Sequence, residues 1–410
     1  MDLRIDLSAY APQKTYSRMG TKVFLDPFRQ SLVPLSPENL LLYKMAMYVH
    51  HVMGVPKGRM AIQQSLRKYG VDSTKVVSIV VHDMIDGKLQ PVALIDCAAP
   101  GNPLSFAPTT QLEEFAKSKG ILYLVVTNGV EIDAYISRAD RLTFWKIDNV
   151  PHYQTICTGH AQAPPIVVTA PVEDLKGKHA KSKSAKLTGT AKPTKAVPNQ
   201  AQLSPEHMVQ VTLLNEALKD TKHKIGPQEH AGIKMVRDCG NRKKSIKLSE
   251  HSSEAVRQRA FIIEDFHKNH QLMCIDIDSE QGHPPTLSVT LDNVDHRQVV
   301  YALDFKSTLD FKGNTVIWTV DLGAMFKSYG PDFIEGLKVA IAEKTAPESA
   351  SSALHLKDST TLYLGSIATS ETIYCNQPEI AALCMNLLAF ALILDEYRET
   401  IKRVQKKAKK

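Results

Sequence analysis

The sequence predicts an α/β region followed by an α+β region, with a flexible basic linker joining them. Three observations support this. Residues 20–160 show helix and strand patterns in the order αβββαβ. Residues 164–204 are rich in Lys, Ala, Thr, Ser and Pro, with too few large apolar side chains to offset the entropy of ordering. Residues 205–405 combine several strand patterns with helices at both ends, and a chain of 410 residues accommodates this division.

The first helix of the α/β region begins at residues 36–38, which read Ser-Pro-Glu. Serine caps a helix, proline is tolerated in the first turn, and an acid suits the positive end of the helix dipole. Apolar residues follow at helical spacing from Leu40 to Val52, and Gly54 ends the helix. The elements expected next are strands at 60–66, 75–82 and 91–96, a helix at 109–119, and strands at 121–127 and 130–136.

Two local signals indicate how these strands pair. Asp86-Gly87 separates two β-branched runs, which predicts a tight hairpin between the second and third strands. Residues 121–127 are apolar almost without interruption, which is typical of a strand buried on both faces of a sheet.

The α+β region begins with a helix at 205–219, followed by a polar stretch to which no element is assigned. The later elements are strands at 271–277, 286–291, 299–305, 315–320 and 360–367, a helix at 332–343, and a final helix from residue 378 into the basic tail. The final helix is apolar almost all round, which predicts a central packing helix. Its most apolar part, 380–394, is shorter than the ~20 residues of a spanning helix, so we expect no membrane partner.

The basic charge of the chain is concentrated in two segments. With 43% hydrophobic and 23% charged residues, the composition is that of a soluble globular protein, and the net charge is +7. Basic segments without interleaved aromatic residues bind phosphate backbones without base stacking, or serve as solubilising spacers, and both interpretations stay open. The basic residues are Lys176, Lys178, Lys181, Lys183, Lys186, Lys192 and Lys195 in the linker, and Lys402, Arg403, Lys406, Lys407, Lys409 and Lys410 in the tail.

Cysteine spacing and motifs exclude several classes of protein. The six cysteines are scattered without paired spacing, which argues against a zinc site or a disulfide framework and predicts reduced thiols in the cytoplasm. The N-terminus lacks the pattern of a signal peptide. No Gly-x-x-x-x-Gly-Lys-Ser/Thr loop occurs, so we expect neither a bound nucleotide nor a helicase motor.

Several short motifs occur in a characteristic order and carry a resemblance. They are Phe24-Leu25-Asp26-Pro27, Val33-Pro34-Leu35-Ser36-Pro37-Glu38, Val55-Pro56, Gln111 on the second helix, and Tyr123-Leu124-Val125-Val126-Thr127-Asn128-Gly129. Residues 24–135 resemble the N-terminal domain of type I restriction enzyme R subunits, a branch of the PD-(D/E)xK nucleases. That resemblance implies a restriction-endonuclease-like αβββαβ core and DNA as the ancestral substrate.

In such nucleases, carboxylates at the ends of paired strands hold Mg²⁺, which prefers oxygen ligands. A lysine two residues beyond the second carboxylate lies on the same strand face and stabilises charge at the phosphate. By the resemblance, the first-strand glutamate corresponds to Gln63 or Gln64, and the metal-binding aspartate to Ser78. The Glu-Cys-Lys-Ala-Pro segment reads Asp-Cys-Ala-Ala-Pro, so the acid remains as Asp96 and the lysine is Ala98. One carboxylate makes a poor Mg²⁺ site, so we expect that cleavage has been lost and no metal cofactor is held.

Two alternatives would restore catalysis. In the first, Asp96 would act with relocated partners, which would be Asp83, Asp86, Lys117 and Lys119. The more usual interpretation is that the two aspartates belong to a polar hairpin and the two lysines to a solvent-exposed helix face. A second Asp…Asp-x-Lys pattern is formed by Asp292, Asp295, Asp304 and Lys306, with Asp310-Phe311-Lys312 repeating its last part. Either would make the chain a divergent Mg²⁺-dependent endonuclease. The histidines His50, His51, His267 and His270 lack nearby ligand pairs and are not metal candidates.

The function that the sequence favours is binding without catalysis. We expect a restriction-nuclease-like protein that binds DNA or a protein partner and acts in restriction or defence against foreign DNA. The divergent endonuclease is one alternative. A structural or adaptor protein, in which the nuclease core is only a scaffold, is the other.

Overall fold

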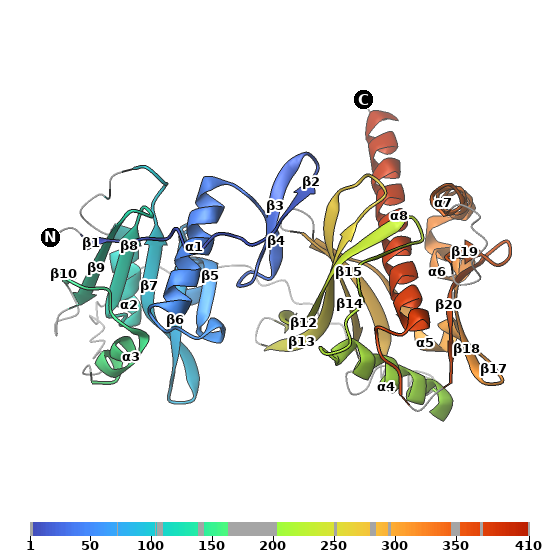
Figure 1. Ribbon diagram of the computed structural model, residues 1–410, viewed down its shortest axis with the longest axis horizontal. Coiled ribbons are helices and arrows are strands. Elements are labelled where there is room, and N and C mark those ends of the chain that lie inside the picture. The colour runs from blue at the N-terminus through green and yellow to red at the C-terminus, as the bar shows by residue number, and fades with distance from the viewer. Residues whose placement is uncertain are drawn as a thin grey trace, which may run out of the picture. The chain divides into compact units, whose positions relative to one another are not determined.

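The protein is a mixed α/β structure with several sheets, shown here as a computed structural model (Figure 1). It divides into two compact units: unit 1 comprises residues 1–10 and 41–202, and unit 2 comprises residues 11–40 and 203–410. The residues described are 3–71, 73–102, 104, 110–137, 143–162, 203–249, 252–278, 284–293, 297–345, 353–369 and 372–408. The predicted flexible linker, with its seven lysines, therefore lies almost entirely outside the described residues.

Unit 1 is built on a seven-stranded sheet. Its strand order is β1-β9-β8-β7-β6-β5, with β10 pairing to β9; β7 and β8 run parallel and are connected through α2. The strands are β1 (Leu3–Arg4), β5 (Met60–Ser65), β6 (Val76–Ile85), β7 (Lys88–Cys97), β8 (Tyr123–Thr127), β9 (Glu131–Ser137) and β10 (Phe144–Ile147). The helices are α1 (Pro37–His51), η1 (Lys57–Arg59), η2 (Leu66–Tyr69), α2 (Thr110–Lys119) and α3 (Tyr153–Gln162).

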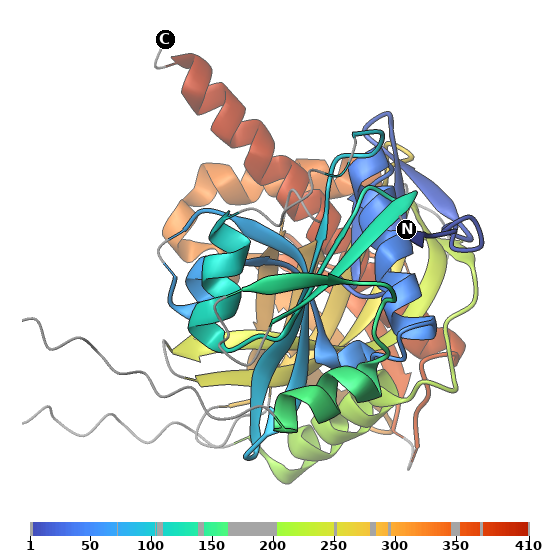
Figure 2. The ribbon, with the colours of Figure 1, turned by 90° about the vertical axis from the view of Figure 1, so that its left-hand side faces the viewer.

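The sheet of unit 1 is covered by helices on both faces. Figure 2 shows α1 and α2 on opposite sides of it. Against α2 pack apolar residues of the central strands, including Val80, Leu94 and Leu124, all at most 1% exposed. The predicted hairpin is present, with Asp86 at φ 50° and Gly87 at φ 73°, which is why an Asp-Gly pair suits this turn. The order α1-β5-β6-β7-α2-β8 agrees with the order expected from the sequence.

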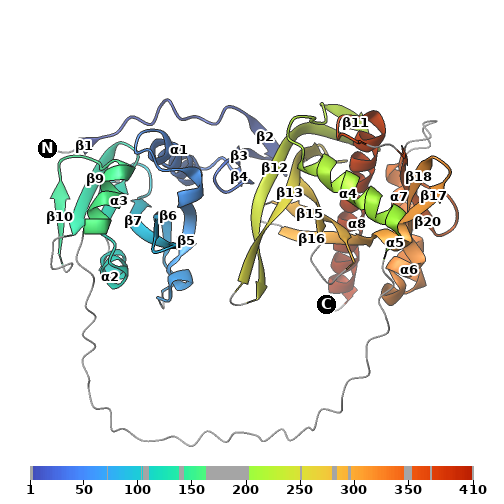
Figure 3. The same cartoon turned by 90° about the horizontal axis from the view of Figure 1, so that it is seen from below.

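The part of unit 2 formed by residues 203–410 contains two antiparallel sheets with α8 between them (Figures 1 and 3). The six-stranded sheet follows chain order: β11 (Gln228–His230), β12 (Ile233–Ser249), β13 (Ser252–Glu264), β14 (His270–Asp278), β15 (Thr286–Asp292) and β16 (Arg297–Asp304). The four-stranded sheet has the order β17 (Leu309–Lys312), β18 (Thr315–Asp321), β20 (Thr361–Ala368) and β19 (His355–Leu356). The helices are α4 (Pro205–Lys219), α5 (Phe305–Thr308), α6 (Leu322–Met325), η3 (Lys327–Tyr329), α7 (Pro331–Lys344) and α8 (Pro378–Ala408).

The helix α8 is the centre of the unit 2 core, as its apolar pattern predicts. Leu383, Leu388 and Phe390 are fully buried, and the buried Asn386 donates to the carbonyl oxygen of Leu364 at 2.8 Å. By length and composition this helix is long and apolar enough to cross a membrane, but 78% of its apolar window is buried inside the structure. A core helix passes the same test.

The predicted boundary of the first domain, residue 20, differs from the division observed. Residues 11–40 form a separate three-stranded sheet, β2 (Thr15–Arg18), β3 (Thr21–Asp26) and β4 (Ser31–Pro34), which clusters with unit 2. Tyr16, Val23 and Leu32 form one apolar cluster with Ile262 and Leu272 of the six-stranded sheet. The apolar face of these strands therefore finds its partner more than 200 residues later in the chain.

The motif at Phe24-Leu25-Asp26-Pro27 has a structural role in this region. Asp26 is 1% exposed, and its carboxylate accepts hydrogen bonds from the backbone N–H of Phe28 at 2.8 Å and the Nε of Arg29 at 2.6 Å. Arg29 in turn donates to Asn39 in the first turn of α1 at 2.9 Å. This network connects the turn after β3 to the start of the helix.

The polar stretch without predicted elements contains the two longest strands of the six-stranded sheet, β12 and β13. Their polarity hides the strand pattern, because part of one sheet face carries buried polar side chains instead of apolar ones. Arg242, Gln258 and Asp276 are at most 8% exposed and follow one another across β12, β13 and β14. Gln258 donates to Asp276 at 2.8 Å, and Arg242 forms an ion pair with Asp292.

Candidate functional site

Three of the predicted site positions form a row across the sheet of unit 1. Ile79 pairs with Ile95, so Ser78 of β6 lies opposite Asp96 of β7. Ile62 and Gln64 of β5 pair with the two residues that flank Ser78, so Gln63 lies opposite Ser78. The row Gln63–Ser78–Asp96 thus brings together the positions at which the resemblance places the nuclease acids.

Gln63 has an unusual backbone. Its φ of 49° lies in the left-handed region, which non-glycine residues seldom adopt, and its side chain is exposed. Gln64, the other candidate for this position, is turned to local contacts: it donates to the carbonyl oxygen of Ile62 at 2.6 Å and accepts from Lys68 at 2.7 Å. Residues with a strained backbone, such as Gln63, concentrate at functional sites.

The Ser78 hydroxyl connects β6 to β7. It donates to Oδ1 of Asp96 at 3.0 Å and accepts from the backbone N–H of Cys97 at 3.0 Å. The backbone N–H of Ser78 also points at Oδ1, at 3.4 Å. A serine in this position therefore binds the remaining carboxylate instead of sharing a metal ion with it.

The second oxygen of Asp96 faces a cation that the sequence patterns did not single out. Nζ of Lys75, just before β6, lies 3.4 Å from Oδ2 of Asp96, and the two side chains are only 18% and 22% exposed. Burial, with the charge of Asp96, raises the pKa of the neighbouring Cys97 thiol to about 12, which keeps it protonated. The nuclease motif has no lysine at the position of Lys75. The side chain of Lys75 reaches Asp96 only in the folded structure, so the sequence contains no indication of this contact.

This donor set does not fit Mg²⁺. The metal needs several oxygen ligands in octahedral geometry. The row offers one carboxylate, and both of its oxygens are engaged by Ser78 and Lys75. Ala98 has no ammonium group to place beside a phosphate, and its backbone N–H is bonded to Thr127 at 2.8 Å. Among the described residues, no group of three or more His, Cys, Asp and Glu side chains is arranged to hold a metal ion.

The relocated candidates are in other settings. The Asp83 carboxylate accepts from the Tyr153 hydroxyl at 3.1 Å. Its pKa is lowered: burial raises it, but hydrogen bonds from Cys157, Met84 and Tyr153 outweigh burial. Asp86 lies in the hairpin turn, ten residues along the chain from Asp96.

The candidates on α2 are also placed elsewhere. Lys117 pairs with Glu113 one helical turn away at 3.5 Å, and Lys119 is one of the residues that line a cavity beside α2. Gln111 belongs to α2, but its side chain lies outside the described residues. No contact joins either lysine to Asp96 in the described part of the structure.

The second Asp…Asp-x-Lys pattern is spread along the sheet of unit 2. Asp304 pairs with Thr286 at one end of β15, whereas Asp292 lies at the other end, six residues or roughly 20 Å away. Asp304 caps α5 by accepting from the N–H of Lys306 at 3.1 Å, and Asp292 is fully buried against Arg242. The structure does not bring these residues together. Asp295 lies outside the described residues, and Asp310 pairs with Lys312 at 3.4 Å on an exposed hairpin.

The histidines have separate partners. His50 bonds to the carbonyl oxygen of Val55 at 2.8 Å, and the His51 ring stacks against Tyr10. His267 pairs with Glu396 at 3.1 Å. His270 bonds to the carbonyl oxygen of Ser17 at 2.9 Å.

Comparison with known proteins bears on the region that contains this row. Residues 38–151 match the family model described as type I restriction enzyme R protein N terminus. Neither the curated proteins nor the solved structures contain a significant match to the chain. The family match begins within α1, so the 24–27 motif and the three-stranded sheet lie outside it. The similarity to type I restriction enzyme R proteins thus covers residues 38–151, the region that contains the row Gln63–Ser78–Asp96.

Proposed function

We propose that unit 1 is a PD-(D/E)xK-type domain that has lost cleavage and retains DNA binding, in a cytoplasmic protein that takes part in restriction or in defence against foreign DNA. The family of residues 38–151 suggests a restriction-related role. The observation that carries the proposal is the Lys75–Asp96 ion pair, completed by the Ser78 hydroxyl.

The ion pair gives a physical reason for DNA binding to persist without a metal. In a nuclease, bound cations neutralise the carboxylates, so that a phosphate can approach them. Here the ammonium group of Lys75 neutralises Asp96 at 3.4 Å. A phosphate group that approaches this row consequently meets no uncompensated negative charge from Asp96.

Two measurements on the full chain test the proposal. Supercoiled plasmid incubated with Mg²⁺ or Mn²⁺ is expected to stay intact with both the natural protein and Asp96→Ala. Nicking that requires Asp96 would overturn the loss of cleavage. In a gel shift at low salt, the protein is expected to retard duplex DNA, and absence of any shift would refute DNA binding and favour an adaptor role.

Charge variants locate the binding surface. Lys75→Met exposes the negative charge of Asp96 to DNA, so we expect weaker binding at low salt than the natural protein shows. Lys88→Gln removes an equal charge from the far end of β7 and serves as the matched control. Deletion of residues 176–195 tests the linker: loss of the shift in this variant, with Lys75→Met unchanged, would assign binding to the linker and not to unit 1.

A further inference from the structure

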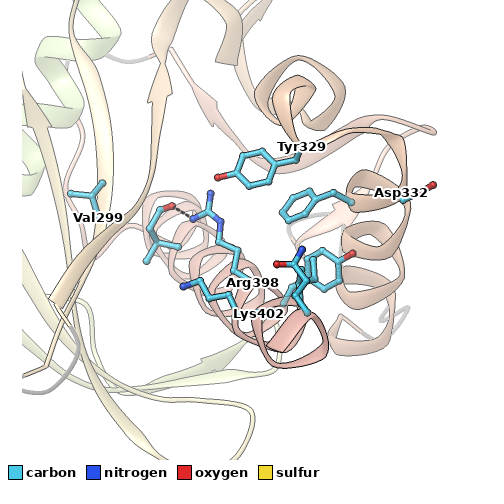
Figure 4. A pocket seen from close by; sticks show the side chains of 10 residues that line it. Val299, Tyr329, Asp332, Arg398 and Lys402 are labelled. Atoms are coloured by element: carbon cyan, nitrogen blue, oxygen red, sulfur yellow. Dashed lines mark hydrogen bonds between the residues drawn. The ribbon is translucent and has the colours of Figure 1, made fainter. Parts of the chain in front are cut away.

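A cavity of about 800 Å³ opens in unit 2 between β16, the η3–α7 segment and the last turns of α8. Its walls combine aromatic rings and cations, among them Tyr329, Phe333, Tyr397, Arg398 and Lys402. Figure 4 shows Arg398 between Tyr329 and Val299, with Lys402 on the same face of α8, whereas Asp332 points away from both. The volume falls in the range of small-molecule sites and accommodates one nucleotide unit.

Arg398 is held in place but has spare hydrogen-bonding capacity. It donates to the carbonyl oxygen of Val300 at 2.6 Å, and its guanidinium carbon lies 5.8 Å from the ring centres of both Phe326 and Tyr329. A guanidinium group has five N–H donors. One of them bonds the carbonyl oxygen of Val300, and the buried Nε is closed to a ligand, so the remaining terminal N–H groups are the donors that a ligand can use. A fixed cation with unused donors is suited to an anionic ligand such as a phosphate.

Lys402 extends this positive charge along the helix. It lies four residues after Arg398, and residues at this spacing share one helix face. Its side chain is 64% exposed, and it pairs with Glu399 at 2.7 Å. Exposed pairs contribute little stability, so a phosphate can replace Glu399 as the partner. Beyond Glu399, residues 400–410 contain no acid, so the approach to the cavity along α8 is basic.

Tyr329 supplies a flat apolar surface at the mouth of the cavity. The residue is 55% exposed, which is unusual for so large a ring. Its ring is supported from within by Phe333, at 4.6 Å between centres, and by Phe326 at 5.9 Å. On the opposite wall, Val299 is 59% exposed on the edge strand β16. An exposed, supported ring beside two cations is the combination with which proteins bind single strands, through base stacking and phosphate contacts.

We propose that this cavity binds single-stranded DNA, with one base stacked on Tyr329 and the adjoining phosphate bound by Arg398 and Lys402. A duplex does not fit, because its bases present only their edges, and the cavity receives a base by its face. The choice of DNA as ligand rests on the proposed function. The binding residues belong to unit 2 and are independent of the Asp96 row.

Fluorescence anisotropy of the full chain with fluorescein-labelled oligo(dT) tests the proposal. Tyr329→Ala is expected to weaken binding by about 10-fold or more, and Tyr329→Phe, which keeps the ring, to restore it. Lys402→Gln is expected to weaken binding and make the salt slope shallower by about one. The matched controls are Tyr374→Ala and Lys312→Gln, both exposed and in other parts of unit 2, and they should bind as the natural protein does.

The outcomes separate this site from the function proposed for unit 1. If Tyr329→Ala and Lys402→Gln bind oligo(dT) with the same affinity as the controls, the cavity is not the binding site. A gel shift that Lys75→Met weakens would still support DNA binding by unit 1 in that case. Competition gives a second test. If unlabelled duplex DNA or a polyglutamate peptide displaces the labelled oligo(dT) as effectively as unlabelled oligo(dT), the proposal is also overturned. If Tyr329→Ala is unfolded, as the fluorescence of the buried Trp318 would report, the comparison of Lys402→Gln with Lys312→Gln decides the matter: equal oligo(dT) affinity of these two variants overturns the proposal.

Discussion

Replacing Ser78 by aspartate would place two carboxylates side by side in the row of unit 1. The Ser78 hydroxyl lies 3.0 Å from Oδ1 of Asp96, so the new charge would lie roughly 4 Å from the old one. At an effective dielectric constant of about 20, the repulsion at that distance is about 4 kcal/mol. Lys75, 3.4 Å from the other oxygen of Asp96, offsets part of it. We expect Ser78→Asp to destabilise unit 1 by about 2–3 kcal/mol at neutral pH.

The sign of the pH dependence follows from the coupled pair. The repulsion acts only when both carboxyl groups are ionised in the folded state. The destabilisation is therefore absent at pH values below about 4, where ordinary carboxyl groups are protonated, and is complete near pH 7. Ser78→Asn, which has nearly the same shape without the charge, is the control and should show no such dependence.

The two tryptophans allow each unit to be followed separately. Trp145 lies in β10 of unit 1, and Trp318 lies in β18 of unit 2 at 1% exposure. Trp318→Phe gives a unit 1 reporter protein, and Trp145→Phe gives a unit 2 reporter protein. Urea unfolding of the unit 1 reporter protein at pH 4.5 and pH 7.5, with Ser78→Asp and Ser78→Asn, measures the effect. Equal unfolding free energies for the two variants at pH 7.5 would refute the adjacency of positions 78 and 96.

The remaining predictions use the same reporter proteins. Arg259→Met leaves the buried carboxylate of Asp238 without its partner, which lies 2.6 Å away, so we expect a loss of about 3–5 kcal/mol in the unfolding free energy of unit 2; an effect under about 1 kcal/mol would contradict this burial. Leu32→Ala opens a cavity against the six-stranded sheet and should cost about 2–5 kcal/mol in unit 2 while leaving the unit 1 signal unchanged; the opposite pattern would assign residues 11–40 to unit 1. Burial lowers the pKa of His82 below 6.5, so unit 1 should lose stability as the pH falls below about 6.5, and His82→Gln should remove that slope between pH 6.5 and 5.

Local patterns predicted those parts of the fold that depend on neighbours in the sequence. The hairpin at Asp86-Gly87 follows from turn chemistry, and the burial of α8 follows from its apolar pattern. The adjacency of Ser78 and Asp96 does not follow from that hairpin alone, because its register would pair Ser78 with Ile95. A register shift between Val81 and His82 moves the pairing by one residue and brings Ser78 opposite Asp96. The resemblance named these positions, but nothing in the sequence predicted the shift that aligns them.

Features that depend on distant partners were not predicted. The ion pair of Lys75 with Asp96 joins residues on two strands through a long side chain, and no spacing rule describes it. Strands β12 and β13 were missed because polar residues such as Arg242 replace apolar ones on part of a buried face. Asp292 and Asp304 are separated because β15 and β16 run antiparallel. Asp292 lies at the end of β15 next to the turn, whereas Asp304 lies at the end of β16 farthest from it.

The division of unit 2 between residues 11–40 and 203–410 has a consequence for how the protein is made. The strands β2–β4 leave the ribosome early, but Ile262 and Leu272, against which they pack, follow more than 200 residues later. At about 5–20 residues per second, that interval is on the order of 10–50 s. Throughout it, Tyr16, Val23 and Leu32 form an apolar surface without its final partner, while unit 1 is completed in between. The nascent chain is then most exposed to aggregation and to chaperones, so we expect slow translation downstream of residue 202 to lower the yield of unit 2 before that of unit 1.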